Sequence, residues 1–88
     1  MKIKSGFMLR EIAGQWVIIP LGARSVEFNV IMTLSESGAL LWKKLEKGSN
    51  KNELLAATLA EYAVDKDIAE ADIDSFIQAI QTKGLLEQ

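Results

Sequence analysis

The stretch that decides the fold of this chain is Met32-Thr33-Leu34-Ser35-Glu36-Ser37-Gly38-Ala39-Leu40-Leu41-Trp42. It predicts a strand that runs directly into a helix, because Ser35 is a good helix N-cap and Glu36 places negative charge in the first turn. The helix then has an inward-facing stripe at helical spacing, formed by Gly38, Leu41, Trp42 and Leu45. Such a junction places a sheet edge beside helices, an arrangement that suits peptide binding better than catalysis.

Composition narrows the classes of protein to which the chain can belong. Its 88 residues favour one domain spanning 1–88, and its net charge of −2 comes from interspersed acids and bases. This balance predicts neither a nucleic-acid-binding surface nor a polybasic patch for membranes. The chain has no histidine and no cysteine, which removes thiol chemistry, the commonest general base and the commonest metal ligand. We therefore expect no metal and no cofactor.

Targeting signals are not evident in the sequence. No apolar run approaches the roughly 20 residues of a membrane span. Residues 1–6 lack the apolar core of a signal peptide. A cytoplasmic location is the expectation that follows.

The first third of the chain predicts strands. Phe7–Ile12 and Gln15–Pro20 are rich in β-forming residues, and the short joint Ala13-Gly14 between them indicates a hairpin. Pro20 lacks an amide hydrogen and should end the second strand, with a loop over 21–24 after it.

A third strand is predicted over Ser25–Leu34, where side chains alternate between two faces. One face has Phe28, Val30, Met32 and Leu34, and the other has Glu27, Asn29, Ile31 and Thr33. Ile31 interrupts the polar face. This indicates either a partly covered second side of the sheet or an apolar spot that a partner covers.

Three helices should fill the rest of the chain. The first stops at Gly48, and the second begins with a capping-box pair, Asn50 and Glu53. Asp65 should cap the third helix, which Gly84 ends. The second helix has its apolar positions at Leu54, Leu55, Thr58, Leu59 and Tyr62, and the buried stripe expected for the third is Ile68, Ile73, Phe76, Ile77 and Ile80. The order βββααα predicts an α+β, winged-helix-like fold: a three-stranded antiparallel sheet followed by three helices.

Side chains that could carry chemistry are better explained by structure. The acidic residues near the third helix lack the spaced loop and central glycine of a calcium site, and helix-end charge accounts for most of them. These residues are Asp65, Asp67, Glu70, Asp72 and Asp74. Trp16 and Trp42 lack the basic surroundings of a platform for nucleic-acid bases. Ser35 and Ser37 have no histidine to activate them, so a catalytic serine is not expected.

Four segments, in their order and spacing, carry a family resemblance. They are Leu9–Pro20, Phe28–Trp42, Glu53–Leu55 with Tyr62–Asp65, and Asp72–Ile77 with Lys83–Leu86. Over essentially its whole length the chain resembles the PqqD family, the small protein D of pyrroloquinoline-quinone biosynthesis and its relatives. That domain is also the recognition element for ribosomally made, post-translationally modified peptides. Gly, Asn and Thr are frequent in the family where this chain has Val30, Ser35 and Ser37.

The resemblance implies a peptide chaperone rather than an enzyme. A PqqD-like protein binds the leader segment of a precursor peptide and presents it to a modifying enzyme, typically a radical S-adenosylmethionine protein. The leader adds a strand to the edge of the sheet and lies against the third helix. Carried over to this chain, the strand that pairs with the leader is Asn29, Val30, Ile31, Met32, Thr33 and Leu34, and the groove wall is Ala69, Asp72, Phe76, Ala79 and Lys83.

Two other classes remain as alternatives. The element order is compatible with a DNA-binding winged helix, but the third helix carries mostly acids where a recognition helix carries Arg and Lys. An enzyme, or an accessory subunit of an enzyme complex, is the second alternative. The lack of histidine and cysteine argues against catalysis by the chain on its own.

Overall fold

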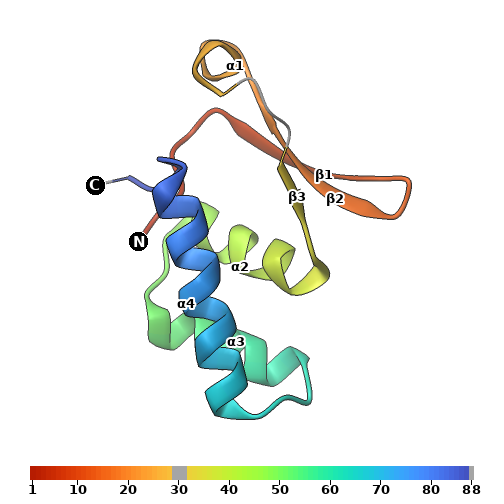
Figure 1. The fold of residues 1–88 in the computed structure, drawn as a ribbon, viewed down its shortest axis with the longest axis vertical. Helices are drawn as coiled ribbons and strands as arrows, with labels where there is room; N and C mark the ends of the chain where they lie inside the picture. Colours follow the sequence, from red (N-terminus) through yellow and green to blue (C-terminus); the bar gives the residue numbers. More distant parts are fainter. Residues whose placement is uncertain (29–31, 88) are drawn as a thin grey trace.

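In the computed structural model, which describes residues 1–28 and 32–87, three strands form one antiparallel sheet in the order β1-β2-β3. β1 (Phe7–Ile12) and β2 (Gln15–Pro20) form the long hairpin of Figure 1, and β3 (Met32–Leu34) pairs with the other side of β2. Helices follow the sheet along the chain, so the predicted α+β fold is confirmed.

The hairpin turn has the backbone shape that a two-residue connection requires. Ala13 and Gly14 have φ angles of 53° and 79°. Positive φ at both central residues is the condition of a type I′ turn, whose twist matches that of the flanking strands. Gly14 adopts this conformation at no steric cost, whereas alanine is an unusual residue there.

The prediction for the segment after β2 is wrong in part. Instead of a loop over 21–24 and a strand from Ser25, the chain forms a short helix, α1 (Arg24–Glu27), before β3. The Ser25 hydroxyl donates to the Gly22 carbonyl at 2.6 Å, and the Arg24 guanidinium donates to the Glu27 carboxylate at 3.1 Å. Local bonds of this kind give the backbone an alternative to a strand, and here they override the alternating pattern.

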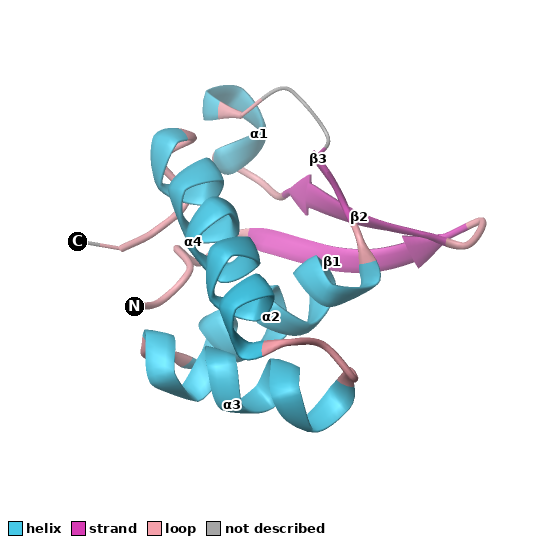
Figure 2. Ribbon diagram, turned by 60° about the horizontal axis from the view of Figure 1, so that its bottom comes forward, coloured by secondary structure: helices cyan, strands magenta, loops and turns pink. Residues whose placement is uncertain are grey.

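The three predicted helices are confirmed as α2 (Glu36–Lys47), α3 (Lys51–Glu61) and α4 (Lys66–Thr82). Figure 2 shows them gathered on one side of the molecule, with the strands on the other. Gly48 follows α2 with a φ of 97°, a conformation that stops the helix and favours glycine. Within residues 1–28 and 32–87, no helix has the length and apolar character needed to cross a bilayer.

The helix N-termini differ in how they are capped. The Ser35 hydroxyl accepts a bond from the Gly38 amide at 3.1 Å. The Asn50 side chain accepts from the Glu53 amide at 2.8 Å, and the Glu53 carboxylate accepts from the Asn50 amide at 3.0 Å, which completes the predicted capping box. Asp65 occupies the N-cap position of α4, but its side chain makes no capping bond.

The core lies where the three long helices meet the inner face of the sheet. Its largest fully buried side chains are Trp42, Leu45, Leu54, Ile73 and Ile80. Phe7 brings β1 onto this core with its ring edge-on to Trp42, the ring centroids 6.2 Å apart. Ile68 was expected to be buried, but its side chain is 54% exposed, because Ala69 takes the inward position in the first turn of α4.

The difference in capping predicts that two similar substitutions lower the free energy of unfolding by different amounts. Asn50→Ala removes one of the two capping-box bonds and should lower the free energy of unfolding by about 1 kcal/mol. Asp65→Ala removes a side chain that makes no capping bond and should cost clearly less. Urea unfolding followed by circular dichroism measures both. An Asp65→Ala loss equal to that of Asn50→Ala would show that the capping bonds do not explain the stability.

Candidate functional site

β3 is an edge strand within the described part of the chain. One side of it pairs with β2, in the register Trp16↔Leu34, Val17↔Thr33 and Ile18↔Met32. The other side has no strand beside it in the sheet, so its amide and carbonyl groups can pair with a further strand. Thr33 is exposed, while Met32 and Leu34 are half-buried and pack against the core.

Gly38, in the first turn of α2, faces both the end of β3 and the middle of α4. A β-carbon at this position would lie 3.5 Å from the Leu34 side chain, 3.5 Å from the Phe76 ring and 3.3 Å from the Ser35 hydroxyl. These three neighbours belong to β3, α4 and the cap of α2. The distances to Leu34 and Phe76 are ordinary van der Waals contacts and only the Ser35 hydroxyl is tight, so this position has room for little more than a methyl group.

A groove of about 340 Å³ opens between α2, α3 and α4, beside the Ser35 cap that directly follows β3. Its apolar surface comes from buried or half-buried side chains of α2 and α4, and its polar surface comes from four hydroxyls and one carboxylate. The apolar contributors include Leu41, Ala69, Ile73 and Phe76, and the polar ones are Ser35, Ser37, Thr58, Asp72 and Ser75. A hollow with this mixture suits an extended peptide, which offers apolar side chains and unpaired backbone groups.

The structure brings some of the predicted site residues together and leaves others apart. Ala69, Asp72 and Phe76 line the groove. Ala69 is only 1% exposed, so it forms the floor rather than the predicted wall. Ala79 and Lys83 are exposed and continue the same face of α4 beyond the groove.

On the strand, Met32, Thr33 and Leu34 form β3, while Asn29, Val30 and Ile31 lie outside the described residues. Sequence reasoning missed Ser37, Thr58 and Ser75 as groove residues. Ser37 lies in the first turn of α2, where the sequence indicates no groove beside it. Thr58 comes from α3, and no sequence pattern places that helix beside the groove.

Two of the acids near α4 form ion pairs with lysines. Asp74 lies 2.6 Å from the Lys51 ammonium and joins α4 to the start of α3, and this hydrogen bond raises the pKa of Lys51. Glu70 lies 3.9 Å from the Lys66 ammonium, one helical turn away. Among residues 1–28 and 32–87, no three acidic side chains are grouped closely enough to hold a metal ion.

The groove belongs to a fold with known relatives. The sequence matches the family model described as coenzyme PQQ synthesis protein D (PqqD) over residues 15–86. The chain belongs to the PqqD family. The resemblance inferred from the four sequence segments is therefore confirmed.

Two solved structures of similar fold carry a peptide. TbiB1, in complex with the TbiA(beta) leader peptide, is 31% identical to this PqqD-family chain, with a TM-score of 0.76 over 99% of this chain and 95% of that one. Lasso peptide synthetase B1, complexed with the leader peptide, has a TM-score of 0.72 over 96% of this chain and 93% of that one. At 17% identity, the second similarity shows the fold alone. No curated protein sequence matches the chain.

The packing around Gly38 predicts that this position does not tolerate a branched side chain. Gly38→Val should lower the free energy of unfolding by about 1–3 kcal/mol, because two methyl groups would collide with Leu34 and Phe76. Ala56→Val, on an exposed position of α3, is the control and should cost well under 1 kcal/mol. Urea unfolding of both variants measures the difference. A Gly38→Val protein as stable as the parent would mean that the junction is not tightly packed.

Proposed function

We propose that this PqqD-family chain is a non-catalytic adaptor. It binds the leader segment of a ribosomally made precursor peptide and presents it to a modifying enzyme, a radical S-adenosylmethionine protein or another peptide-modifying enzyme. The observation that carries the proposal is the free edge of β3, which leads at Ser35 into a groove with an apolar floor and a polar rim. The leader peptide bound to TbiB1, a relative of nearly the same length, supports it.

In the proposed complex the leader adds a fourth strand along Met32–Leu34. Backbone hydrogen bonds to β3 supply affinity for any extended peptide, and the groove supplies selectivity through the side chains that it accepts. Phe76 and the floor of Ala69 would contact apolar leader side chains, and Asp72 would contact polar ones. Ordering a flexible peptide opposes binding, so a dissociation constant near 1 μM, or about −8 kcal/mol, is the expected affinity.

The adaptor role leaves catalysis to the partner enzyme. The chain lacks histidine and cysteine, so it contributes no ordinary general base or thiolate. We place the protein in the cytoplasm, where precursor peptides leave the ribosome. The neighbouring genes give a first test, since a short peptide gene and a gene for a modifying enzyme should lie beside this one.

A substitution on α4 tests the groove. Ala79→Arg should weaken leader binding at least tenfold, because a long charged side chain would stand on the face of α4 that continues from Phe76. Gln81→Arg makes a similar change about 200° around the same helix and should leave binding unchanged. Isothermal titration with a synthetic leader from the neighbouring precursor gene measures both. Equal affinities for the two variants would remove this face of α4 from the site.

Chemical shifts test the strand pairing. Adding the same leader to ¹⁵N-labelled protein should move the amide signals of Thr33, Leu34 and Phe76 most strongly, because these residues lie on the free edge and in the groove. The β1–β2 hairpin turn serves as the reference region, since it lies at the far end of the sheet in Figure 1. Shifts confined to that hairpin or to α2 would contradict the proposed placement even if the peptide binds.

A further inference from the structure

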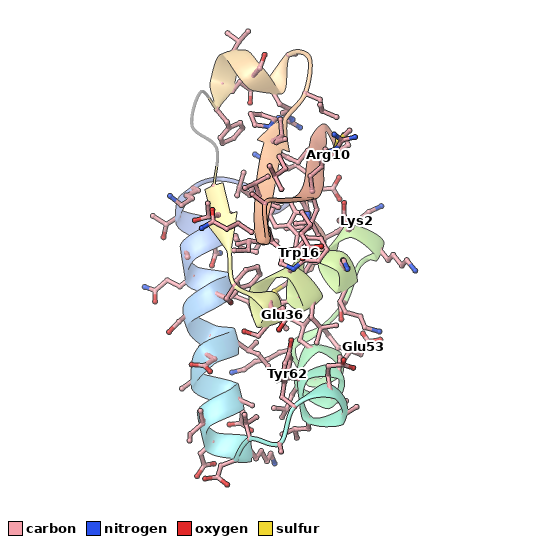
Figure 3. The ribbon with its side chains drawn as sticks, turned by 90° about the vertical axis from the view of Figure 1, so that its right-hand side faces the viewer. Lys2, Arg10, Trp16, Glu36, Glu53 and Tyr62 are labelled. Atoms are coloured by element: carbon pink, nitrogen blue, oxygen red, sulfur yellow. The ribbon has the colours of Figure 1, made fainter. Side chains whose placement is uncertain are left out.

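A second hollow, of about 220 Å³, lies on the other side of the first turn of α2. Its walls include two aromatic rings, Trp16 from β2 and Tyr62 from the end of α3, and two carboxylates, Glu36 and Glu61. Figure 3 shows Trp16, Glu36 and Tyr62 one below another on the same face of the molecule. We call these four side chains the aromatic–acidic pocket.

The pocket already holds a cation of the chain itself. The Lys43 ammonium lies over the Trp16 ring, 4.4 Å from its centroid, which is a favourable cation–π distance. Neither Glu36 nor Glu61 forms an ion pair with any residue in 1–28 or 32–87. The pocket therefore contains two carboxylates against one ammonium, and its aromatic faces accept positive charge.

An arginine side chain matches this chemistry better than other protein side chains. Its flat guanidinium stacks on aromatic rings and donates in a fork to carboxylates. A lysine ammonium satisfies the same partners less completely, because it has no plane to stack. A neutral side chain gains neither contact.

The pocket is continuous with the proposed leader groove. A hollow of about 280 Å³ lies between them and shares Ser35, Ser37 and Asp72 with the groove and Glu36 and Tyr62 with the pocket. The surface is therefore indented around the whole first turn of α2. A peptide paired with β3 that continues past Leu34 would follow this path.

We propose that a basic residue of the bound leader, arginine in preference to lysine, occupies the aromatic–acidic pocket. The residue lies outside the segment that pairs with β3, and Lys43 holds its place until the peptide binds. This inference rests on the proposed leader binding, and it adds a charge requirement to the peptide that the groove alone does not impose.

The pocket is tested with probes too short to add a strand. Acetyl-Gly-Arg-Gly-amide, titrated into ¹⁵N-labelled protein, should move the Trp16 indole N–H signal, with a dissociation constant on the order of 1–10 mM. The citrulline analogue, which has the same shape without the charge, should leave the signal in place. The indole signal of fully buried Trp42 is the internal reference.

Removing the Lys43 ammonium tests whether it competes with the arginine probe for the pocket. Lys43→Met should tighten binding of the arginine probe about two- to fivefold, because the probe no longer competes with the ammonium. Lys44→Met makes the same charge change on an exposed position of α2 outside the pocket and should not tighten it to this extent. In the opposite direction, Glu61→Gln should weaken binding about two- to fivefold, and exposed Glu46→Gln should not.

The outcomes separate the pocket from the leader groove. Equal shifts with the arginine and citrulline probes, or equal affinities for Lys43→Met and Lys44→Met, would overturn the pocket while leaving the groove intact. Ala79→Arg should not change binding of the short probes. The same test applies to the synthetic leader with its arginines replaced by citrulline. This replacement should weaken binding to the parent protein more than binding to the Glu61→Gln variant. An equal loss of affinity in both proteins would show that the leader does not use the pocket.

Discussion

The interaction on which the rest of the structure depends is the packing around the bare backbone of Gly38. Leu34 and Phe76 come from elements far apart in the sequence, and each stands 3.5 Å from where a β-carbon would lie. Gly38 therefore leaves room for little more than a methyl group between the edge strand and α4, and the groove opens from there between α2, α3 and α4. The packing of ordinary core residues and helix caps therefore forms the site, and no charged pair is needed to hold it open.

The local elements were predictable because the physics that forms them is local. The cap at Ser35 and the box of Asn50 and Glu53 each depend on residues three positions apart, and the hairpin pairs two strands that are adjacent in the sequence across a two-residue turn. The helix α1 was missed because the alternation over Ser25–Leu34 satisfies the strand pattern equally well. Only the hydrogen bonds within 22–27 favour the helix, and their strength depends on geometry that the alternation does not reveal.

The groove was predictable only in part, because a sequence pattern gives the positions along one helix but not their depth or their neighbours in space. A line of residues along α4 follows from helical periodicity, and Asp72 and Phe76 lie on the groove as that line requires. Periodicity does not say how deep a residue lies, so Ala69 was placed on the wall although it is buried. Thr58 enters from α3 through tertiary packing, which no spacing within a single helix encodes.

The hairpin turn has one further consequence. Ala13 holds a φ of 53°, a left-handed conformation that costs a residue with a β-carbon about 1 kcal/mol or more relative to glycine. The tip of the hairpin lies at the far end of the sheet from α4 (Figure 1). The chain therefore carries strain at a place remote from the groove. Engineering that relieves this strain would raise thermal tolerance without reshaping the surface that selects a peptide.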